Sequence, residues 1–294
     1  MRDTLFGFIA AHFPTERISD SKLLAALWRV FYFGLAPRNP FVMRTRLYSL
    51  IAHPQKGTLT RAVIRRGHWE PEETEAFIAC LTPGAFVMDV GANFGHYSMV
   101  ASRIVGPDGR IVAFEPHGTT FKLLAENCAL QPHSNITPVR AGVAAENGEM
   151  TLTGDSANPG GHSFSAENVY GTGATECVPV HGLDGYLADH GEGRKLDLIK
   201  IDVQGFEGQV IRGAKATIER DRPTIFLEVS PLPMQNAGED YRDLLSFFDQ
   251  TGYAVHLIHE THGTLERVSY EEAEKRLSNP AIEYLDCVFK PDPD

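Results

Sequence analysis

The sequence contains few cysteines, and they are far apart. Cys80, Cys128, Cys177 and Cys287 are the only four, and none forms a CxxC or CxxH spacing. This pattern argues against a zinc site and against a redox dithiol, so we expect no bound metal. Dispersed thiols indicate a reducing compartment. Together with an N-terminus that lacks the features of a signal peptide, they predict a cytoplasmic protein.

The sequence also lacks an apolar run of transmembrane length. Residues 23–35 are apolar except for Arg29, and the run is shorter than the ~20 residues that a membrane-spanning helix needs. We therefore expect no transmembrane segment. We interpret this run as a segment that covers the core, with weak peripheral contact to a membrane surface as the alternative.

Positive charge is scarce. Lys and Arg number 27 against 38 Asp and Glu, which gives a net charge of -11. Nucleic-acid binding needs a clustered basic surface, so this balance argues against a nucleic-acid partner. The 294 residues suffice for one large domain, and the sequence leaves open whether copies of the chain form a homo-oligomer.

The chain changes pattern near residue 66. Residues 1–66 are apolar and interrupted by prolines, which predicts several short helices that form an N-terminal helical extension or cap. In residues 67–294, apolar strands alternate with helices, which predicts an α/β domain with a mainly parallel, seven-stranded sheet and helices on both faces. The strands are expected at residues 85–90, 110–114, 136–143, 196–201, 224–229, 253–258 and 284–289. Helices are expected at residues 71–81, 95–105, 119–130, from 207 onward, and at 241–251.

An insertion of about residues 146–182 interrupts this alternation. It contains two short expected strands, at 150–152 and 177–180, and between them a glycine-rich loop that includes His162. A long loop within a compact domain is more often functional than idle. We therefore expect the insertion to contribute to a binding site.

The first expected strand ends in an acidic residue and a glycine-rich turn. Asp89 is followed by Gly91 and Gly95 in a GxxxG spacing. The dinucleotide fingerprint GxGxxG, which helps to bring backbone N–H groups to a pyrophosphate, is absent. S-Adenosylmethionine (SAM) carries no phosphate, and its ammonium group could donate a hydrogen bond to Asp89. The alternative is a turn in which the glycines are purely steric.

Two more acidic residues follow neighbouring strands. Glu115 ends the second strand, where a carboxylate can accept hydrogen bonds from both ribose hydroxyls of a nucleoside; the alternative is a solvated loop carboxylate. Asp202 follows the strand that contains Lys200, and its alternative role is a helix N-cap neutralised by that lysine. Parallel strands present their carboxyl ends at one edge, so we expect Asp89, Glu115 and Asp202 to converge there.

Together these motifs closely resemble the FkbM family of SAM-dependent class I methyltransferases, which have a Rossmann-like fold. The resemblance covers roughly residues 66–290 and rests on segments 67–71, 89–95, 114–116, 183–187, 199–207, 210–214 and 226–229. Gln204 departs from the family, which usually has Glu at that position. Residues 1–65 lie outside the resemblance and are expected to help shape the acceptor pocket.

The resemblance implies a SAM-dependent O-methyltransferase that methylates a hydroxyl of a sugar, glycan or secondary metabolite and releases S-adenosylhomocysteine. The implied cofactor-binding residues are Asp89, Gly91, Ala92, Asn93, Gly95, Tyr97, Ser98, Glu115, Pro116, Ala141, Gly142 and Asp202. Among them, Ala141 and Gly142 are expected beside the adenine, and Tyr97 and Ser98 beside the methionine carboxylate. The candidates for the base that removes the hydroxyl proton are Asp202, Glu228 and His162. An NAD(P)-dependent oxidoreductase and a non-catalytic interaction module of the same fold are the alternatives.

Overall fold

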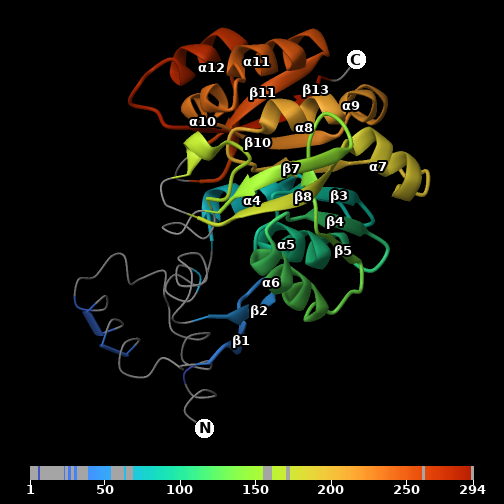
Figure 1. The fold of residues 1–294 in the computed structure, drawn as a ribbon, viewed down its shortest axis with the longest axis vertical. Coiled ribbons are helices and arrows are strands. Elements are labelled where there is room, and N and C mark those ends of the chain that lie inside the picture. The colour runs from blue at the N-terminus through green and yellow to red at the C-terminus, as the bar shows by residue number, and fades with distance from the viewer. Residues whose placement is uncertain are drawn as a thin grey trace.

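The main body of the protein is an eight-stranded sheet between two layers of helices (Figure 1). The computed structural model describes residues 39–53, 69–154, 161–169, 173–259 and 262–292, and in addition Phe6, Leu23, Ala26, Leu27, Val30, Phe31 and Val63. The strand order is β12-β11-β13-β10-β9-β3-β4-β5. The strands are β3 (Phe86–Val90), β4 (Arg110–Phe114), β5 (Ile136–Val139), β9 (Leu198–Ile201), β10 (Thr224–Val229), β11 (Tyr253–Ile258), β12 (Leu265–Arg267) and β13 (Leu285–Pro291).

The predicted fold class is confirmed. Strands β5, β4, β3, β9 and β10 run parallel, and β13, β11 and β12 continue the sheet in antiparallel pairs. The sheet has one strand more than the seven predicted. The extra strand, β12, is three residues long and mostly exposed, so it carries no apolar alternation by which it could be predicted.

Helices cover both faces of the sheet, because successive strand residues point to opposite sides. They are α4 (Pro71–Ala79), α5 (His96–Val105), α6 (Gly118–Ala129), α7 (Leu183–His190), α8 (Glu207–Gly213), α9 (Lys215–Asp221), α10 (Pro231–Asn236), α11 (Tyr241–Gln250) and α12 (Tyr270–Leu277). Val87 packs in one core with Phe77 of α4 and Met99 of α5. Its neighbour Met88 packs in the other core, which includes Phe248 of α11.

The described part of residues 1–66 contains a β-hairpin, which corrects the prediction of helices there. Strands β1 (Phe41–Arg44) and β2 (Ser49–Ala52) pair antiparallel. Leu50 and Ala52 are fully buried, an alternation with period two that suits a strand. The hairpin lies beside α6, where the Ile51 N–H donates to Asn127 Oδ1 at 2.7 Å. Seven other described residues of this region are helical, and the rest of the prediction for residues 1–66 lies outside the described residues.

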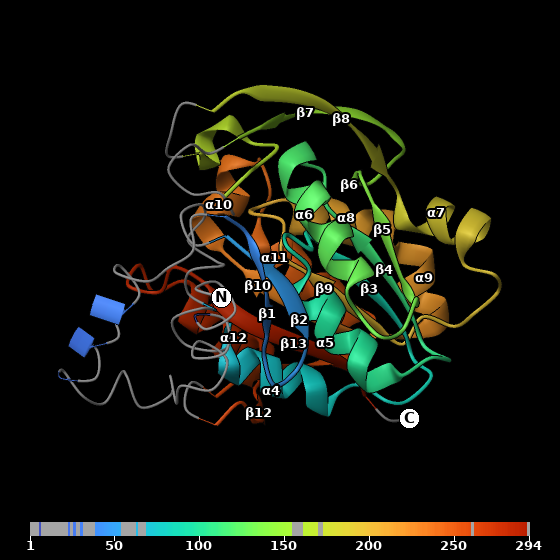
Figure 2. The same cartoon turned by 90° about the horizontal axis from the view of Figure 1, so that it is seen from below.

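The insertion forms a small second sheet, in the order β6-β8-β7. It comprises β6 (Gly142–Val143), β7 (Gly148–Thr153) and β8 (Thr175–His181), so both predicted strands of the insertion are confirmed. The predicted strand 136–143 is divided, since β5 ends at Val139 and β6 belongs to the second sheet. Figure 2 shows β7 and β8 arching over the molecule on the side away from α4.

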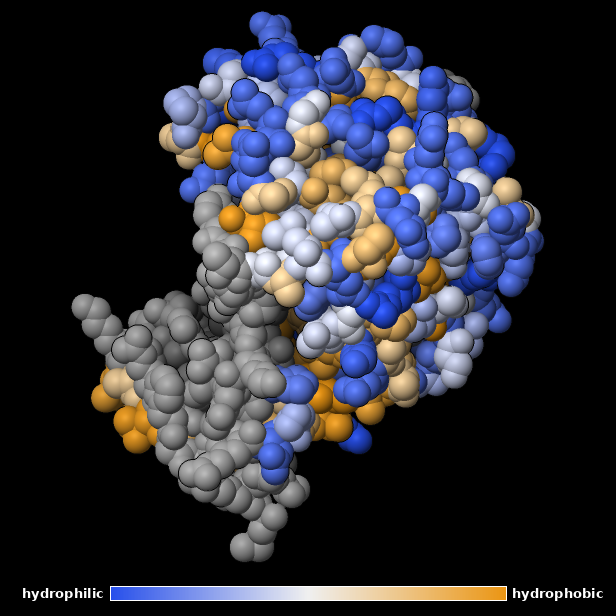
Figure 3. Space-filling model, in the orientation of Figure 1, coloured by the Kyte–Doolittle hydropathy of each residue, from blue (hydrophilic) through white to orange (hydrophobic). Residues whose placement is uncertain are grey.

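The described surface is mainly polar around the C-terminal elements, whereas apolar residues show near β1 and β2 (Figure 3). Among the described residues, no helix combines the length and apolarity that crossing a membrane requires. The four cysteines are free thiols.

Candidate functional site

A cavity of about 570 Å³, including open space at its mouth, lies at the carboxyl ends of β3, β4 and β9. The main sheet supplies Glu115 and Asp202, and the insertion supplies the facing wall through His162 and Phe164. The lining residues are Val90, Gly91, Asn93, Phe114, Glu115, Pro116, Ala141, Gly142, Val143, Leu152, His162, Phe164, Asp202, Val203 and Gln204. This edge is where open α/β sheets bind ligands.

Gly91 allows two loops to meet at the cavity floor. Its φ is +84°, and a Cβ atom there would lie 1.9 Å from the Asp202 carbonyl oxygen. The Gly91 N–H donates to the Phe114 carbonyl at 3.0 Å. A side chain at position 91 would therefore separate the ends of β3 and β9.

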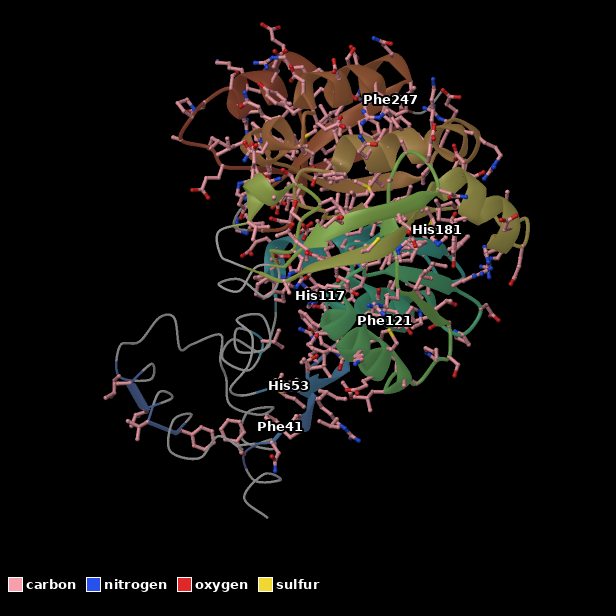
Figure 4. All side chains as sticks on the ribbon, viewed as in Figure 1. Phe41, His53, His117, Phe121, His181 and Phe247 are labelled. Carbon is pink, nitrogen blue, oxygen red and sulfur yellow. The ribbon has the colours of Figure 1, made fainter. Side chains whose placement is uncertain are left out.

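Glu115 is a buried carboxylate, 6% exposed, that lines the cavity. Its Oε2 accepts the Asn93 N–H at 3.0 Å, and its Oε1 accepts the His117 N–H at 2.8 Å. His117 lies between β4 and α6 (Figure 4). Burial raises the pKa of Glu115 to about 7, against the opposing effect of these two hydrogen bonds. Glu115 thus shapes the loop after β3 and keeps further acceptor capacity.

Four backbone amides of the loop after β3 are already used within the protein. The N–H groups of Gly91 and Ala92 donate to Phe114, that of Asn93 to Glu115, and that of Gly95 to Ala92. A pyrophosphate needs such N–H groups to converge on it. Two carboxylates in the cavity also disfavour an anion there. These features suit a ligand without phosphate.

Asp202 is half-buried and joins Glu115 in the cavity lining. Its Oδ1 accepts a hydrogen bond from Gln204 Nε2 at 3.2 Å. Gln204 and Gly205 are both left-handed, with φ of 53° and 98°. A Cβ at Gly205 would lie 2.3 Å from the Pro233 carbonyl oxygen, so a glycine is required.

Lys200 lies buried beneath this edge and pairs with Glu73 of α4 at 3.1 Å. Burial alone would lower the pKa of Lys200, but Glu73, Asp202 and other nearby carboxylates raise it above its ordinary value. The Tyr97 hydroxyl lies within hydrogen-bond distance of two carboxylates, 2.6 Å from Glu73 Oε2 and 3.0 Å from Glu70 Oε2. The partner that the buried ammonium requires is therefore Glu73.

Three of the predicted cofactor-binding residues, Asp89, Tyr97 and Ser98, lie outside the lining of this cavity. Asp89 is 2% exposed, pairs in register with Lys200, and accepts the Ser98 hydroxyl at 2.5 Å. Burial raises the pKa of Asp89 to about 6. Side chains alternate along β3, so Asp89 points to the α5 face while Val90 lines the cavity. Of the three carboxylates expected to converge, two meet in the cavity, and Asp89 lies close enough to both to act on them electrostatically.

The remaining predicted residues divide into lining and supporting ones. Pro116, Ala141 and Gly142 line the cavity. A Cβ atom at position 142 would lie 2.5 Å from the Phe164 ring, so the glycine leaves room for this ring. Ala92 and Gly95 support the first loop; a Cβ at Gly95 would lie 2.7 Å from Leu124 Cδ1 of α6. His162 lines the cavity, with its ring 3.9 Å from the His117 ring.

Glu228 lies outside the cavity lining, in a row of carboxylates that continues from it. Ile201 pairs with Leu227, so Asp202 and Glu228 are the next residues of adjacent strands. Glu228 in turn pairs directly with Asp286 of β13. Burial, Asp202 and Asp286 raise the pKa of Glu228 well above its ordinary value. Burial, Glu73 and Asp202 raise the pKa of Asp286 to about 7.

Several residues of this region were missed by sequence reasoning. Asp286 could have been found, because a charged residue inside an apolar strand is unusual. Glu73 gave no such signal, since an acid in the first turn of a helix is ordinary. Phe164 and the other apolar lining residues belong to elements whose approach depends on tertiary structure. Within the described ranges, no group of three or more His, Cys, Asp or Glu is arranged to hold a metal ion.

Comparison with known protein families shows which family this chain resembles. The profile of the methyltransferase FkbM domain matches residues 89–255. The chain belongs to the FkbM family. The resemblance of the sequence motifs is thereby confirmed.

Curated relatives of this FkbM protein match it only in part. Hexuronic acid methyltransferase AglP of Haloferax volcanii is 30% identical over 126 residues, which cover 42% of this chain and 48% of the relative. Methyltransferase sdnD of Sordaria araneosa is 26% identical over 163 residues, which cover 46% of this chain and 62% of the relative. The matched regions thus span about half to three-fifths of these relatives.

Solved structures show only distant likeness. Methyltransferase FkbM from Methylobacillus flagellatus aligns with a TM-score of 0.43 and 14% identity, over 79% of this chain and 52% of that one. Aeropyrum pernix fibrillarin, solved with bound S-adenosyl-L-methionine, aligns with a TM-score of 0.40 and 12% identity, over 86% of this chain and 99% of that one.

Proposed function

We propose that this protein is a SAM-dependent O-methyltransferase that acts on a hydroxyl of a small molecule, a sugar or a glycan. The observation that carries the proposal is the cavity at the carboxyl edge of the sheet, with the buried carboxylate Glu115 in its wall. The loop amides beside Glu115 are already used, which favours SAM over a dinucleotide. Membership of the FkbM family supports the same reaction.

The residues of the cavity fit SAM chemically. Glu115 would accept hydrogen bonds from the ribose hydroxyls, with Ala141, Gly142 and Phe164 beside the adenine. Asp202 is placed to attract the positively charged methionine end. When bound, SAM supplies an activated methyl group on a sulfonium sulfur. The chain's own contribution is to hold the acceptor oxygen in line, and such positioning can lower a barrier by roughly 7–11 kcal/mol.

We propose that the carboxyl pair of Glu228 and its cross-strand partner Asp286 accepts the single proton of the acceptor hydroxyl. The sheet order places them beyond Asp202, on the side away from Glu115. A general base works best when its pKa is near the working pH, and the pKa of Asp286 is about 7. Of the other two candidates for the base, Asp202 lies at the methionine end of the proposed site, and His162 lies on the insertion wall beside His117.

The row of carboxylates also affects which methyl acceptor can bind. AglP is named for hexuronic acid, whose carboxylate would meet that of Asp202 here. Like charges repel, so we propose a neutral sugar or polyol as the acceptor. Methyl transfer to neutral glycosides should exceed transfer to matched uronides; faster transfer to the uronides would refute this part of the proposal.

Calorimetry tests the cofactor. The purified chain should bind SAM and S-adenosylhomocysteine, and NADH should give no heat. Binding of NADH without SAM would replace the proposal with an oxidoreductase. Binding of SAM without methyl transfer to any member of a hydroxyl-acceptor panel would indicate a non-catalytic module.

A transfer assay with labelled SAM tests the base. Glu228→Gln and Asp286→Asn should each lower kcat, with ~100-fold as the lower end of the range for a lost general base, and leave SAM affinity unchanged. His162→Asn serves as the comparison and should retain most of kcat. Activity that is lost in EDTA and restored by magnesium would show that the metal-free prediction is wrong.

A further inference from the structure

The inserted segment holds the turn that follows β9 through a single carbonyl group. Ser163 Oγ donates to the Gln204 carbonyl at 3.1 Å, and Asn168 Nδ2 donates to the same oxygen at 2.9 Å. Ser163 is 1% exposed, so this contact is shielded from competing water. The insertion therefore forms one wall of the cavity and also fixes the backbone next to Asp202.

Asn168 also forms hydrogen bonds with α10 through both ends of its amide group. Its Nδ2 also donates to the Pro233 carbonyl at 2.9 Å, and its Oδ1 accepts Asn236 Nδ2 at 2.9 Å. Pro233 and Asn236 belong to α10. One side chain thus joins three segments that are far apart in sequence: the insertion, the turn after β9, and α10.

The turn that Asn168 contacts has an unfavourable backbone conformation, which these hydrogen bonds stabilise. Gln204 is left-handed at φ 53°, a region that a residue with a side chain seldom adopts, and Gly205 follows at φ 98°. A Cβ at Gly205 would lie 2.7 Å from Asn168 Nδ2. The glycine is therefore what allows the amide to reach the carbonyl.

This turn determines where a cavity wall lies. Val203 and Gln204 line the cavity, and the Gln204 side chain donates to Asp202 at 3.2 Å. A shift of the turn would move both the wall and the carboxylate. We propose that Asn168 is a positioning residue that fixes the turn after β9, so that the insertion sets the affinity of the cavity for SAM. This inference rests on the proposed function.

The isosteric variant Asn168→Asp tests it, because an aspartate has no N–H to donate to either carbonyl. SAM affinity should fall roughly 5- to 150-fold for the loss of two hydrogen bonds. Ser163→Ala removes the other donor to Gln204 and should weaken binding in the same direction by a smaller factor; it also gives a result if Asn168→Asp fails to fold. Ser165→Ala is the matched control, since Ser165 Oγ donates to the Asn236 carbonyl at 3.1 Å and joins the insertion to α10 without touching the turn.

A purely structural role would make all three variants alike. If affinity falls in proportion to the melting temperature, with Ser165→Ala as weak a binder as Asn168→Asp, the proposal is overturned. If Asn168→Asp binds SAM as tightly as the unmodified chain, it is also overturned. Asn168→Gln, which keeps the amide donors, should recover part of the affinity.

Hydrogen exchange provides a measurement that does not depend on SAM. The Gly205 N–H donates to Glu207 Oε1 at 3.1 Å, and its exchange should quicken in Asn168→Asp but not in Ser165→Ala. Unchanged exchange at Gly205 would contradict the positioning role. If the unmodified chain binds no SAM while exchange at Gly205 responds as expected, the proposed function fails and the structural link stands.

Discussion

Replacing Glu115 by Gln should weaken SAM binding while leaving the fold intact. The side chain keeps its size, but the negative acceptor that faces the cavity is lost. A hydrogen bond to a charged group contributes about 1.5–3 kcal/mol, so the Kd for SAM should rise roughly 10- to 150-fold. Calorimetry with SAM and S-adenosylhomocysteine measures the change.

The stability of this variant should change little, because two effects oppose each other. Burial first, and then Asp89 and Asp202, raise the pKa of Glu115 from its ordinary 4.5 to about 7. The folded state therefore holds the Glu115 proton more tightly than the unfolded state does. The stability that results is fully present below about pH 4.5 and is lost as the pH rises to about 7, so that burying the ionised carboxylate costs about 3 kcal/mol above this range. Glutamine removes this cost but can accept only one of the two backbone N–H bonds that Glu115 accepts.

The pH dependence of binding gives a second measurement. The ionised form of Glu115 accepts hydrogen bonds best, so SAM affinity of the unmodified chain should rise as the pH rises through about 7. The Gln variant should lack this rise. Asp89→Asn is the matched control: it neutralises another buried carboxylate, one that does not line the cavity. If Glu115→Gln binds SAM as tightly as the unmodified chain does, the assignment of Glu115 to the ribose is refuted.

Two further predictions concern stability, measured by urea denaturation. Lys200→Met leaves Glu73 buried without its partner and should cost about 3–5 kcal/mol; the double variant with Glu73→Gln should regain most of this, and a double variant as unstable as the single one would contradict the pairing. Gly91→Ala should cost several times more than Gly84→Ala, because both glycines have positive φ but a Cβ at Gly84 meets nothing within 4 Å. Equal losses would show that the approach of Asp202 to Gly91 is not what requires the glycine.

The sequence predicted the central sheet well because its strands are buried on both faces. Residues 110–114, 224–229 and 253–258 were predicted with the bounds that the structure has. Such strands are continuous apolar runs whose ends are marked by polar or turn residues. The hairpin of β1 and β2 was missed because its apolar residues come close together in the chain and, among prolines, are equally compatible with short helices.

The candidate site was predicted in part, and the division has a physical reason. Glu115 and Asp202 follow directly from strand ends, since the ends of parallel strands meet at one edge. Asp89 lies on the α5 face of β3, which could not be predicted because a strand end does not reveal which face a side chain takes. Asn168 gave no local signal at all, because its contacts are to carbonyls far away in sequence.

The position of β13 has a consequence for how the chain folds. This strand comes after β10, β11 and β12 in sequence but lies between β10 and β11 in the sheet. Until residues 285–291 have been synthesised, β10 and β11 cannot be joined, and each has an unpaired edge. Exposed edges are templates for association between chains, so nascent or C-terminally shortened molecules should be the aggregation-prone species of this protein.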